Sequence, residues 1–311
     1  MSKRPKSSSK SRSRSGGGRG SGRGGESGSN RSKSADKRDS GGGGGRSGSG
    51  GRQGQSQGRS RPKGLGGDQV EGRHAVRELL LAGARPVREV LMIEDLASAD
   101  ILTDIEDLAH ELGVGLRKVS RRHLANEAVT DSHQGVVAKA APLNEVDFDR
   151  MISNPNAFLL VLDGVTDPGN LGAILRTAEC AGVTGVVLGR HRAAHISPTV
   201  TKTAAGAVEY VPLTLVGGIP ASLAAMKEAG VLTVGLDEAG ERPIFEIPMS
   251  DYGQIALVLG AEGRGLSQLV RKRVDLLASI PLAGHLNSLN VAMAAAVACF
   301  EVLRTRQGRK L

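Results

Sequence analysis

The sequence predicts an α/β fold of two domains behind a long low-complexity tail. Residues 1–67 are almost wholly Gly, Ser, Arg and Lys, whereas the rest of the chain alternates between helical patterns and short apolar runs. Such alternation is typical of sheets that carry helices on their faces. We expect a tail over residues 1–67, a small domain over 68–142, a linker over 143–156 and a larger domain over 157–311.

The tail holds most of the positive charge. It has 17 Lys or Arg against 3 acidic residues, a net charge of +14, while the remaining residues have 24 basic and 29 acidic ones, a net charge of −5. With so few apolar side chains it cannot offset the entropy cost of ordering its backbone, so we expect disorder. A mobile basic arm would contact RNA phosphates without reading sequence, and a solubilising linker is the alternative.

The two cysteines, Cys180 and Cys299, lie far apart in apolar helical contexts. Neither has the spacing of a metal or redox site, so we expect both to be small buried hydrophobic residues and expect no bound metal. The sequence shows no apolar signal core near its start and no apolar run of about 18 residues, which favours a cytoplasmic location without membrane insertion.

The small domain begins with a helix whose apolar face is Ala75, Val76, Leu79 and Leu80. The pattern then predicts a strand at 90–93, a helix at 101–112, a strand at 114–119, a helix at 121–128 and a strand at 135–138. Residues 68–142 contain no Phe, Tyr or Trp. If this domain binds RNA, it must therefore use basic side chains, backbone amides and shape rather than base stacking.

The larger domain shows continuous apolar runs, which suit parallel strands buried on both faces. These runs cover residues 158–162, 185–188, 231–236, 255–259 and 276–280. Helical patterns alternate with them at residues 171–181, 221–229, 266–273 and 289–303. The prediction is a doubly wound parallel sheet, in which ligands bind beyond the carboxyl ends of the strands.

Three predicted strand ends carry unusual loops. Asn170 and Arg176 follow the first one, nearly two helical turns apart, although taken alone they are better explained as a helix cap and an exposed arginine. The second loop, 259–267, has three glycines that allow close backbone approach to a ligand. The third, 280–292, crowds Asn287, Ser288 and Asn290 where capping the last helix needs only one of them.

These three loops resemble motifs one, two and three of the SpoU (TrmH) branch of the SPOUT methyltransferases. The resemblance implies a sheet with a deep trefoil knot, a homodimer with active sites at its interface, and S-adenosylmethionine held mainly by backbone groups. By position, Gly260, Ile280 and Leu289 should line the cofactor pocket.

Residues 71–76 and 132–138 resemble the N-terminal substrate-binding domain of the rRNA guanosine 2′-O-methyltransferases, similar in shape to ribosomal protein L30 or L7Ae. The resemblance therefore implies methyl transfer to a ribose 2′-hydroxyl of large-subunit rRNA, most naturally at a guanosine. Methylation of another rRNA or tRNA nucleotide, including an adenosine linked to antibiotic resistance, and a non-catalytic ribosome-assembly protein are the alternatives.

The same resemblance suggests roles for the polar residues. Arg176 should lie nearest the hydroxyl; because guanidinium is normally protonated, clamping a phosphate and stabilising the alkoxide suit it better than acting as a base. Asn170 should orient Arg176 or the ribose, and Glu262 should hold the arginine. Ser288 and Asn290 should complete the pocket.

Overall fold

The computed structural model describes residues 64–308 except 98 and 192–194. The expected disorder of residues 1–63 lies outside this range. Residues 64–67 differ from the expectation, because Leu65 is 2% exposed and packs in the core of the larger domain. Backbone hydrogen bonds with Ile196 and Leu143 also hold this stretch, so the tail prediction is wrong for these four residues.

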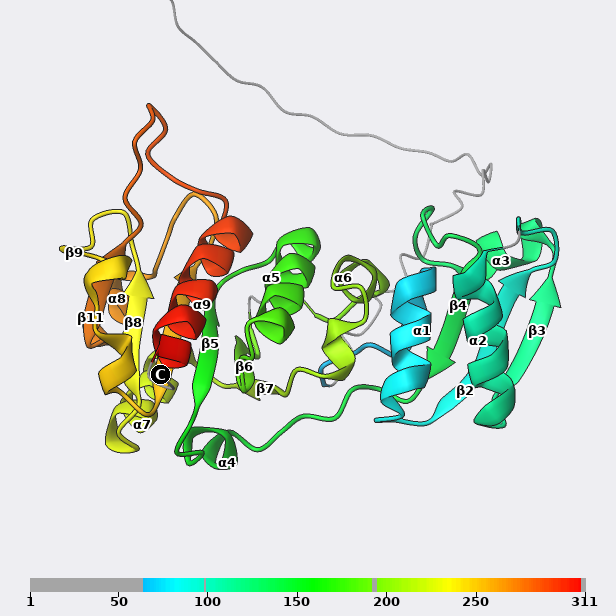
Figure 1. Ribbon diagram of the computed structural model, residues 1–311, viewed down its shortest axis with the longest axis horizontal. Coiled ribbons are helices and arrows are strands. Elements are labelled where there is room, and N and C mark those ends of the chain that lie inside the picture. Colours follow the sequence, from blue (N-terminus) through cyan, green and yellow to red (C-terminus); the bar gives the residue numbers. More distant parts are fainter. Residues whose placement is uncertain (1–63, 98, 192–194, 309–311) are drawn as a thin grey trace, which may run out of the picture. The chain divides into compact units, whose positions relative to one another are not determined.

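The N-terminal domain is a four-stranded sheet in the order β1-β4-β2-β3 (Figure 1). Its strands are β1 (Gln69–Glu71), β2 (Val87–Ile93), β3 (Gly115–Val119) and β4 (Val136–Ala140), and its helices are α1 (Arg73–Ala82), α2 (Asp100–Glu111) and α3 (Arg121–Glu127). The strand period of two divides β2 between two cores. Val90 and Met92 pack with α1 and α2, while Leu91 and Ile93 pack with Leu124 of α3.

The C-terminal domain is a seven-stranded parallel sheet in the order β7-β6-β5-β10-β8-β11-β9. Its strands are β5 (Phe158–Asp163), β6 (Gly185–Gly189), β7 (Leu213–Val216), β8 (Leu232–Leu236), β9 (Arg242–Pro243), β10 (Ile255–Gly260) and β11 (Leu276–Ser279). The helices are α4 (Phe148–Ile152), α5 (Pro168–Cys180), α6 (Pro198–Thr203), α7 (Ile219–Glu228), α8 (Gln268–Arg273) and α9 (Val291–Gly308), with short 3₁₀ turns η1 (Ala207–Glu209), η2 (Ile244–Glu246) and η3 (Met249–Asp251).

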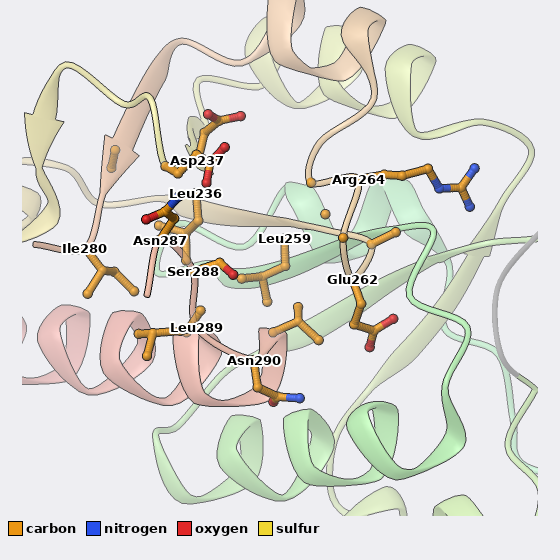
Figure 2. A pocket seen from close by; sticks show the side chains of 18 of the residues that line it. Leu236, Asp237, Leu259, Glu262, Arg264, Ile280, Asn287, Ser288, Leu289 and Asn290 are labelled. Carbon is orange, nitrogen blue, oxygen red and sulfur yellow. The ribbon is translucent and has the colours of Figure 1, made fainter. Parts of the chain in front are cut away.

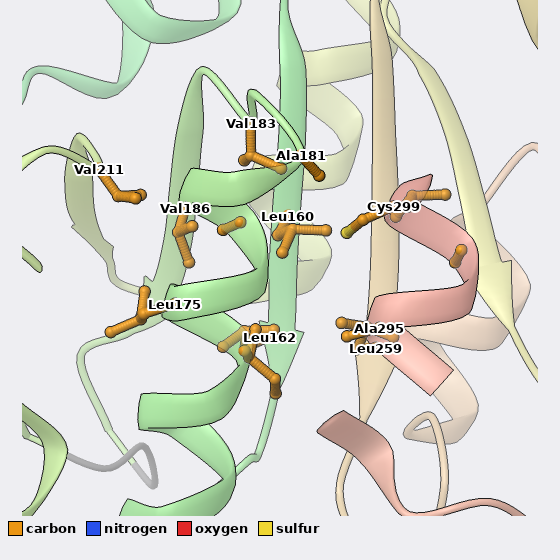
Figure 3. Packing of buried hydrophobic residues seen from close by; sticks show 14 of the residues in the cluster. Leu160, Leu162, Leu175, Ala181, Val183, Val186, Val211, Leu259, Ala295 and Cys299 are labelled. Carbon is orange, nitrogen blue, oxygen red and sulfur yellow. The ribbon is translucent and has the colours of Figure 1, made fainter. Parts of the chain in front are cut away.

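Helices cover both faces of this sheet, which confirms the doubly wound prediction. Leu160 and Leu162 of β5 pack against α5, α6 and α9, and Figure 3 shows this cluster between α5 and α9. Leu159 and Val161 point to the opposite core with α4, α7 and α8. The five predicted strands are present, but β7, β9 and α6 were not expected because each is too short to show a clear periodicity.

The expectation that both cysteines are buried holds for one of them only. Cys299 is buried as expected, but Cys180 is exposed. It lies nine residues from Leu171, on the opposite face of α5 from the buried stripe of Leu171, Ile174 and Ala178. Within the predicted linker, Met151 of α4 is buried in the core of the C-terminal domain. The trefoil knot remains a prediction.

Candidate active site

A cavity of about 540 Å³ lies beyond the carboxyl ends of β8, β10 and β11 (Figure 2). This is the place where a doubly wound sheet binds ligands, and the volume suits a cofactor-sized molecule. Its apolar side chains include Leu236, Leu259, Ile280, Leu282 and Leu289. Its charged side chains are Asp237, Glu238, Glu262, Arg264 and Arg271. One part of the cavity can therefore hold an apolar group while another holds cationic or hydrogen-bonding groups.

The loop after β10 forms one wall of the cavity and is tightly folded. Ala261 and Gly265 exchange backbone hydrogen bonds of 3.1 and 2.8 Å. A Cβ on Gly260 would lie 2.1 Å from the carbonyl carbon of Gly265, so no side chain fits there. The carboxylate of Asp163, at the end of β5, accepts a 2.7 Å hydrogen bond from the Ser267 amide and holds the far end of the loop.

Three polar side chains from the three loops meet beside the cavity. Asn170 donates through Nδ2 to a carboxylate oxygen of Glu262. Asn290 donates through Nδ2 to Oδ1 of Asn170 at 2.9 Å. Glu262 and Asn290 line the cavity, whereas Asn170 joins them from α5. The chain thus brings together residues up to 120 positions apart in sequence.

The structure decides between the capping and site interpretations for two of these residues. The cap of α5 is Asp167, whose carboxylate accepts from the Asn170 amide at 2.7 Å, so Asn170 is not the cap. Asn290 does both: its Oδ1 accepts from the amides of Ala292 and Met293 in the first turn of α9, while its Nδ2 binds Asn170. Capping fixes the amide so that its Nδ2 points at α5.

Arg176 is exposed on α5 and is not among the residues that line the cavity. Within the described residues it makes no hydrogen bond with Asn170 or Glu262; these two bind each other instead. Within one chain Arg176 therefore contacts neither residue, and the expectation that Asn170 orients Arg176 or the ribose and that Glu262 holds the arginine stays a prediction. A spacing of six residues places Arg176 about 120° away from Asn170 around the helix, which explains the separation.

The other predicted site residues lie at the cavity. Gly260, Ile280, Ser288 and Leu289 all line it, and Ser288 is exposed. Sequence reasoning missed Asp237, Glu238, Arg264 and Arg271. Asp237 and Glu238 directly follow the predicted strand 231–236, so the rule applied to the other strand ends would have found them. Asp237 is nearly buried and pairs with Arg271 at 2.8 Å.

The two segments of the N-terminal domain singled out from the sequence pack together. The fully buried Glu71 carboxylate accepts hydrogen bonds from Gln69, the Val129 amide, and the amide and hydroxyl of Thr130. His133 accepts through Nδ1 from the Gly135 amide at 3.0 Å. These bonds hold the loop 129–135 in one conformation on the surface of the domain.

Two absences apply to the described part of the chain only. In residues 64–308, apart from the gaps, no three or more His, Cys, Asp or Glu side chains are grouped so that they could hold a metal ion. No helix in that part has the length and apolar character needed to cross a membrane.

The fold and the cavity define an α/β protein that binds a ligand at the carboxyl end of a parallel sheet. Residues 157–300 match the SpoU rRNA Methylase family, and residues 69–146 match the family described as RNA 2′-O ribose methyltransferase substrate binding. The chain belongs to the SpoU rRNA methylase family.

Curated relatives match almost along their whole length. The chain is 37% identical over 247 residues to the 23S rRNA (guanosine-2′-O-)-methyltransferase RlmB of Photobacterium profundum, covering 77% of this chain and 98% of the relative. It is 36% identical to the enzyme of the same name from Escherichia coli K12, covering 77% and 99%.

A solved structure with the same fold is similar over both domains. The SpoU methyltransferase AviRb from Streptomyces viridochromogenes, in complex with the cofactor AdoMet, superposes with a TM-score of 0.65 at 26% identity. The match covers 77% of this chain and 90% of that one.

Proposed function

We propose that this protein transfers the methyl group of S-adenosylmethionine to the ribose 2′-hydroxyl of a guanosine in 23S rRNA. The observation that carries the proposal is the cavity at the strand ends, bordered by the hydrogen-bonded chain Glu262–Asn170–Asn290. The relatives named RlmB and the match of residues 69–146 to the substrate-binding family support rRNA as the substrate.

The residues of the cavity fit S-adenosylmethionine. Leu236, Leu259 and Ile280 offer apolar surface for an adenine ring, and the closed turn at Gly260 leaves backbone groups accessible to a ligand. The carboxylate of Glu238 suits the positive charges of the molecule. When bound, the cofactor supplies an activated methyl group on a sulfonium sulfur, which needs no metal.

In this proposal the protein holds the acceptor ribose in line with the methyl group. The amides of Asn170 and Asn290 are fixed by each other and by Glu262, so the site is preorganised and little reorganisation is needed when substrate binds. Arg176 clamps an RNA phosphate and stabilises the developing alkoxide electrostatically, while the hydroxyl proton passes to water, the methyl–sulfur bond breaks and S-adenosylhomocysteine leaves. Ser288, at the mouth of the cavity, hydrogen-bonds the substrate or nearby backbone.

We further propose that two copies form a homodimer. Met293 and Phe300 of α9 are 57% and 46% exposed, seven residues apart on one face with Ala296 and Val297 between them. An apolar stripe of this kind is typical of a surface that is covered by a partner. Since Arg176 lies outside the cavity of its own chain, a second copy at this surface is also the simplest way to bring an arginine to the acceptor.

The oligomeric state is tested by sedimentation velocity. The wild-type protein should sediment as a dimer, and Phe300→Asp should sediment as a monomer with a folded circular dichroism spectrum. Leu112→Asp is the matched control, because Leu112 is 52% exposed on the N-terminal domain, away from the stripe, and this variant should stay dimeric. A dimeric Phe300→Asp protein would reject this interface.

Because the substrate is rRNA, we propose a cytoplasmic location.

The activity is tested with tritiated S-adenosylmethionine and unmodified 23S rRNA, 16S rRNA and tRNA, followed by mapping of the labelled ribose. We expect label on one guanosine of 23S rRNA. Label on another nucleotide would change the target but not the reaction. Absence of label from all three RNAs, together with absence of cofactor binding, would instead favour a non-catalytic RNA-binding protein.

A further inference from the structure

Two segments of the chain run side by side from one domain to the other. The first covers residues 64–68 and the second residues 140–146. Leu143 donates its amide to the Gly66 carbonyl at 2.9 Å, and Ala140 donates to the Asp68 carbonyl at 2.9 Å. Gly67 also donates to the carbonyl of Ile196, in the C-terminal domain, at 2.8 Å. The domains are therefore joined by a paired connection rather than by a single strand of linker.

Arg85 lies where these two segments meet. It belongs to the loop between α1 and β2, and its side chain is only 2% exposed. Its Nη1 donates to the carbonyl of Gly67 at 2.6 Å and to the carbonyl of Ala141. One guanidinium nitrogen thus binds both crossing segments.

The other edge of the same guanidinium binds the C-terminal domain. Nε and Nη2 donate to the two carboxylate oxygens of Glu209 at 2.8 and 2.7 Å, in a bidentate pair. The Glu209 side chain is 1% exposed. A planar guanidinium with all three of its nitrogens hydrogen-bonded fixes orientation as well as distance, which a lysine could not do.

Further contacts between the domains surround this pair. Tyr210, next to Glu209, donates to a carboxylate oxygen of Glu78 on α1 at 2.8 Å. Gly206 approaches the same helix so closely that a Cβ there would lie 2.3 Å from the Cβ of Glu78. Burying an ion pair gives little net stability, because desolvation opposes the attraction.

We propose that the Arg85–Glu209 pair determines which nucleotide is methylated, by holding the RNA-binding domain at a fixed orientation to the methyl-transfer cavity. This role presupposes the proposed function. RNA bound by the N-terminal domain can present only the ribose that lies at a set position relative to the cavity. Small displacements of a reacting group lower rates steeply, by about 100-fold for 1 Å. A rigid connection therefore gives both rate and target selection.

The first test removes both charges together, so that no unpaired buried charge is left to unfold the protein. The variant is Arg85→Met with Glu209→Leu in the full chain, and the control is Arg88→Met, an exposed arginine three residues away. We expect the double variant to bind S-adenosylmethionine within twofold of wild type and to lose roughly 100-fold in kcat on 23S rRNA. Its remaining label should spread to neighbouring nucleotides, whereas the control should resemble wild type.

The second test does not depend on activity. Spin labels are placed at Arg122→Cys in the N-terminal domain and Glu228→Cys in the C-terminal domain, both exposed, in a Cys180→Ser background and diluted with unlabelled protein. Electron-electron double resonance should give a narrow distance distribution with Arg85 and Glu209 intact and a broad one in the double variant. A distribution that stays narrow would refute the proposal that the Arg85–Glu209 pair fixes the orientation of the two domains. This outcome does not depend on whether the wild type labels any RNA.

A broadened distribution with an unchanged kcat and an unchanged methylated nucleotide would refute target selection while leaving the proposed function intact. Absence of label with wild-type protein, by contrast, counts against the proposed function alone.

Discussion

The side-chain Nδ2 of Asn290 donates a 2.9 Å hydrogen bond to the side-chain Oδ1 of Asn170, and this bond connects the first turns of α9 and α5. The same Asn290 side chain accepts from the amides of Ala292 and Met293. One residue therefore caps α9 and positions a second site residue. The capping of α9 and the hydrogen bond to Asn170 can be separated by substitution.

Asn290→Asp should abolish most methyl transfer without loosening α9. Aspartate keeps the oxygen that caps the helix but cannot donate to Asn170, so the chain to Glu262 is broken. We expect kcat to fall by about 100-fold with the melting temperature nearly unchanged. Asn290→Ala should lose both the activity and about 1 kcal/mol of stability. If the aspartate variant keeps wild-type kcat, the bond to Asn170 has no part in the reaction.

Arg176→Ala should lower methyl transfer by about 100-fold or more, because it removes the positive charge proposed to stabilise the alkoxide. Its affinity for S-adenosylmethionine, measured by calorimetry, should stay within twofold, since Arg176 does not line the cavity. Lys272→Ala, at an exposed residue of α8, serves as the control. Near wild-type turnover by the Arg176 variant would remove this residue from the mechanism.

Gly260→Ala should lose cofactor binding and about 1–3 kcal/mol of stability. The added methyl would meet the backbone of Gly265 and Leu266 at 2.1 to 2.3 Å, so the loop that forms the cavity wall must move. Gly284→Ala is the matched control, because nothing lies within 4 Å of the position of its Cβ. Cofactor affinity and thermal unfolding of both variants check the prediction, which fails if Gly260→Ala binds like wild type.

The protein should lose stability in acid as the carboxylate of Asp275 becomes protonated. Burial opposes its ionisation, but hydrogen bonds from Lys227 and from Thr233 outweigh that effect and lower the pKa of its carboxyl. Its contribution to the free energy of unfolding is complete above the ordinary pKa of about 3.9 and is lost as pH falls through the lower, folded pKa. Asp275→Asn should cost about 1–3 kcal/mol at pH 7.

The same substitution should leave the unfolding free energies of wild type and variant closer together at pH 3 than at pH 7. Denaturant unfolding at the two pH values measures this difference. An equal difference in unfolding free energy at both pH values would show that the charge on Asp275 does not contribute to stability.

Deleting residues 1–63 should weaken RNA binding and flatten its dependence on salt, because this segment carries 17 basic and 3 acidic residues. The deletion stops before Leu65, whose side chain is part of the core of the C-terminal domain. Affinity for 23S rRNA at several salt concentrations gives the slope. A slope equal to that of the full chain would make the tail a linker.

Much of the site was predictable because the loops stand at strand ends. Apolar runs locate the strands, and in a parallel sheet their carboxyl ends lie on one edge, so Asn170, Glu262 and Asn290 were expected to converge. The same rule, applied to the strand at 231–236, would have included Asp237 and Glu238. What the pattern could not give was the pairing of Asn170 with Glu262, since that depends on the path of each loop rather than on its position.

Local sequence determined the class of fold, the strand and helix faces, and the residues gathered at the cavity, because hydrophobic periodicity and turn residues act over a few positions. Tertiary structure alone decided that Leu65 belongs to the C-terminal core, that Arg176 lies outside the cavity, and that Arg85 binds Glu209 across 124 positions of sequence. Such contacts form between segments distant in the chain, and no local pattern encodes which distant group will satisfy a buried charge.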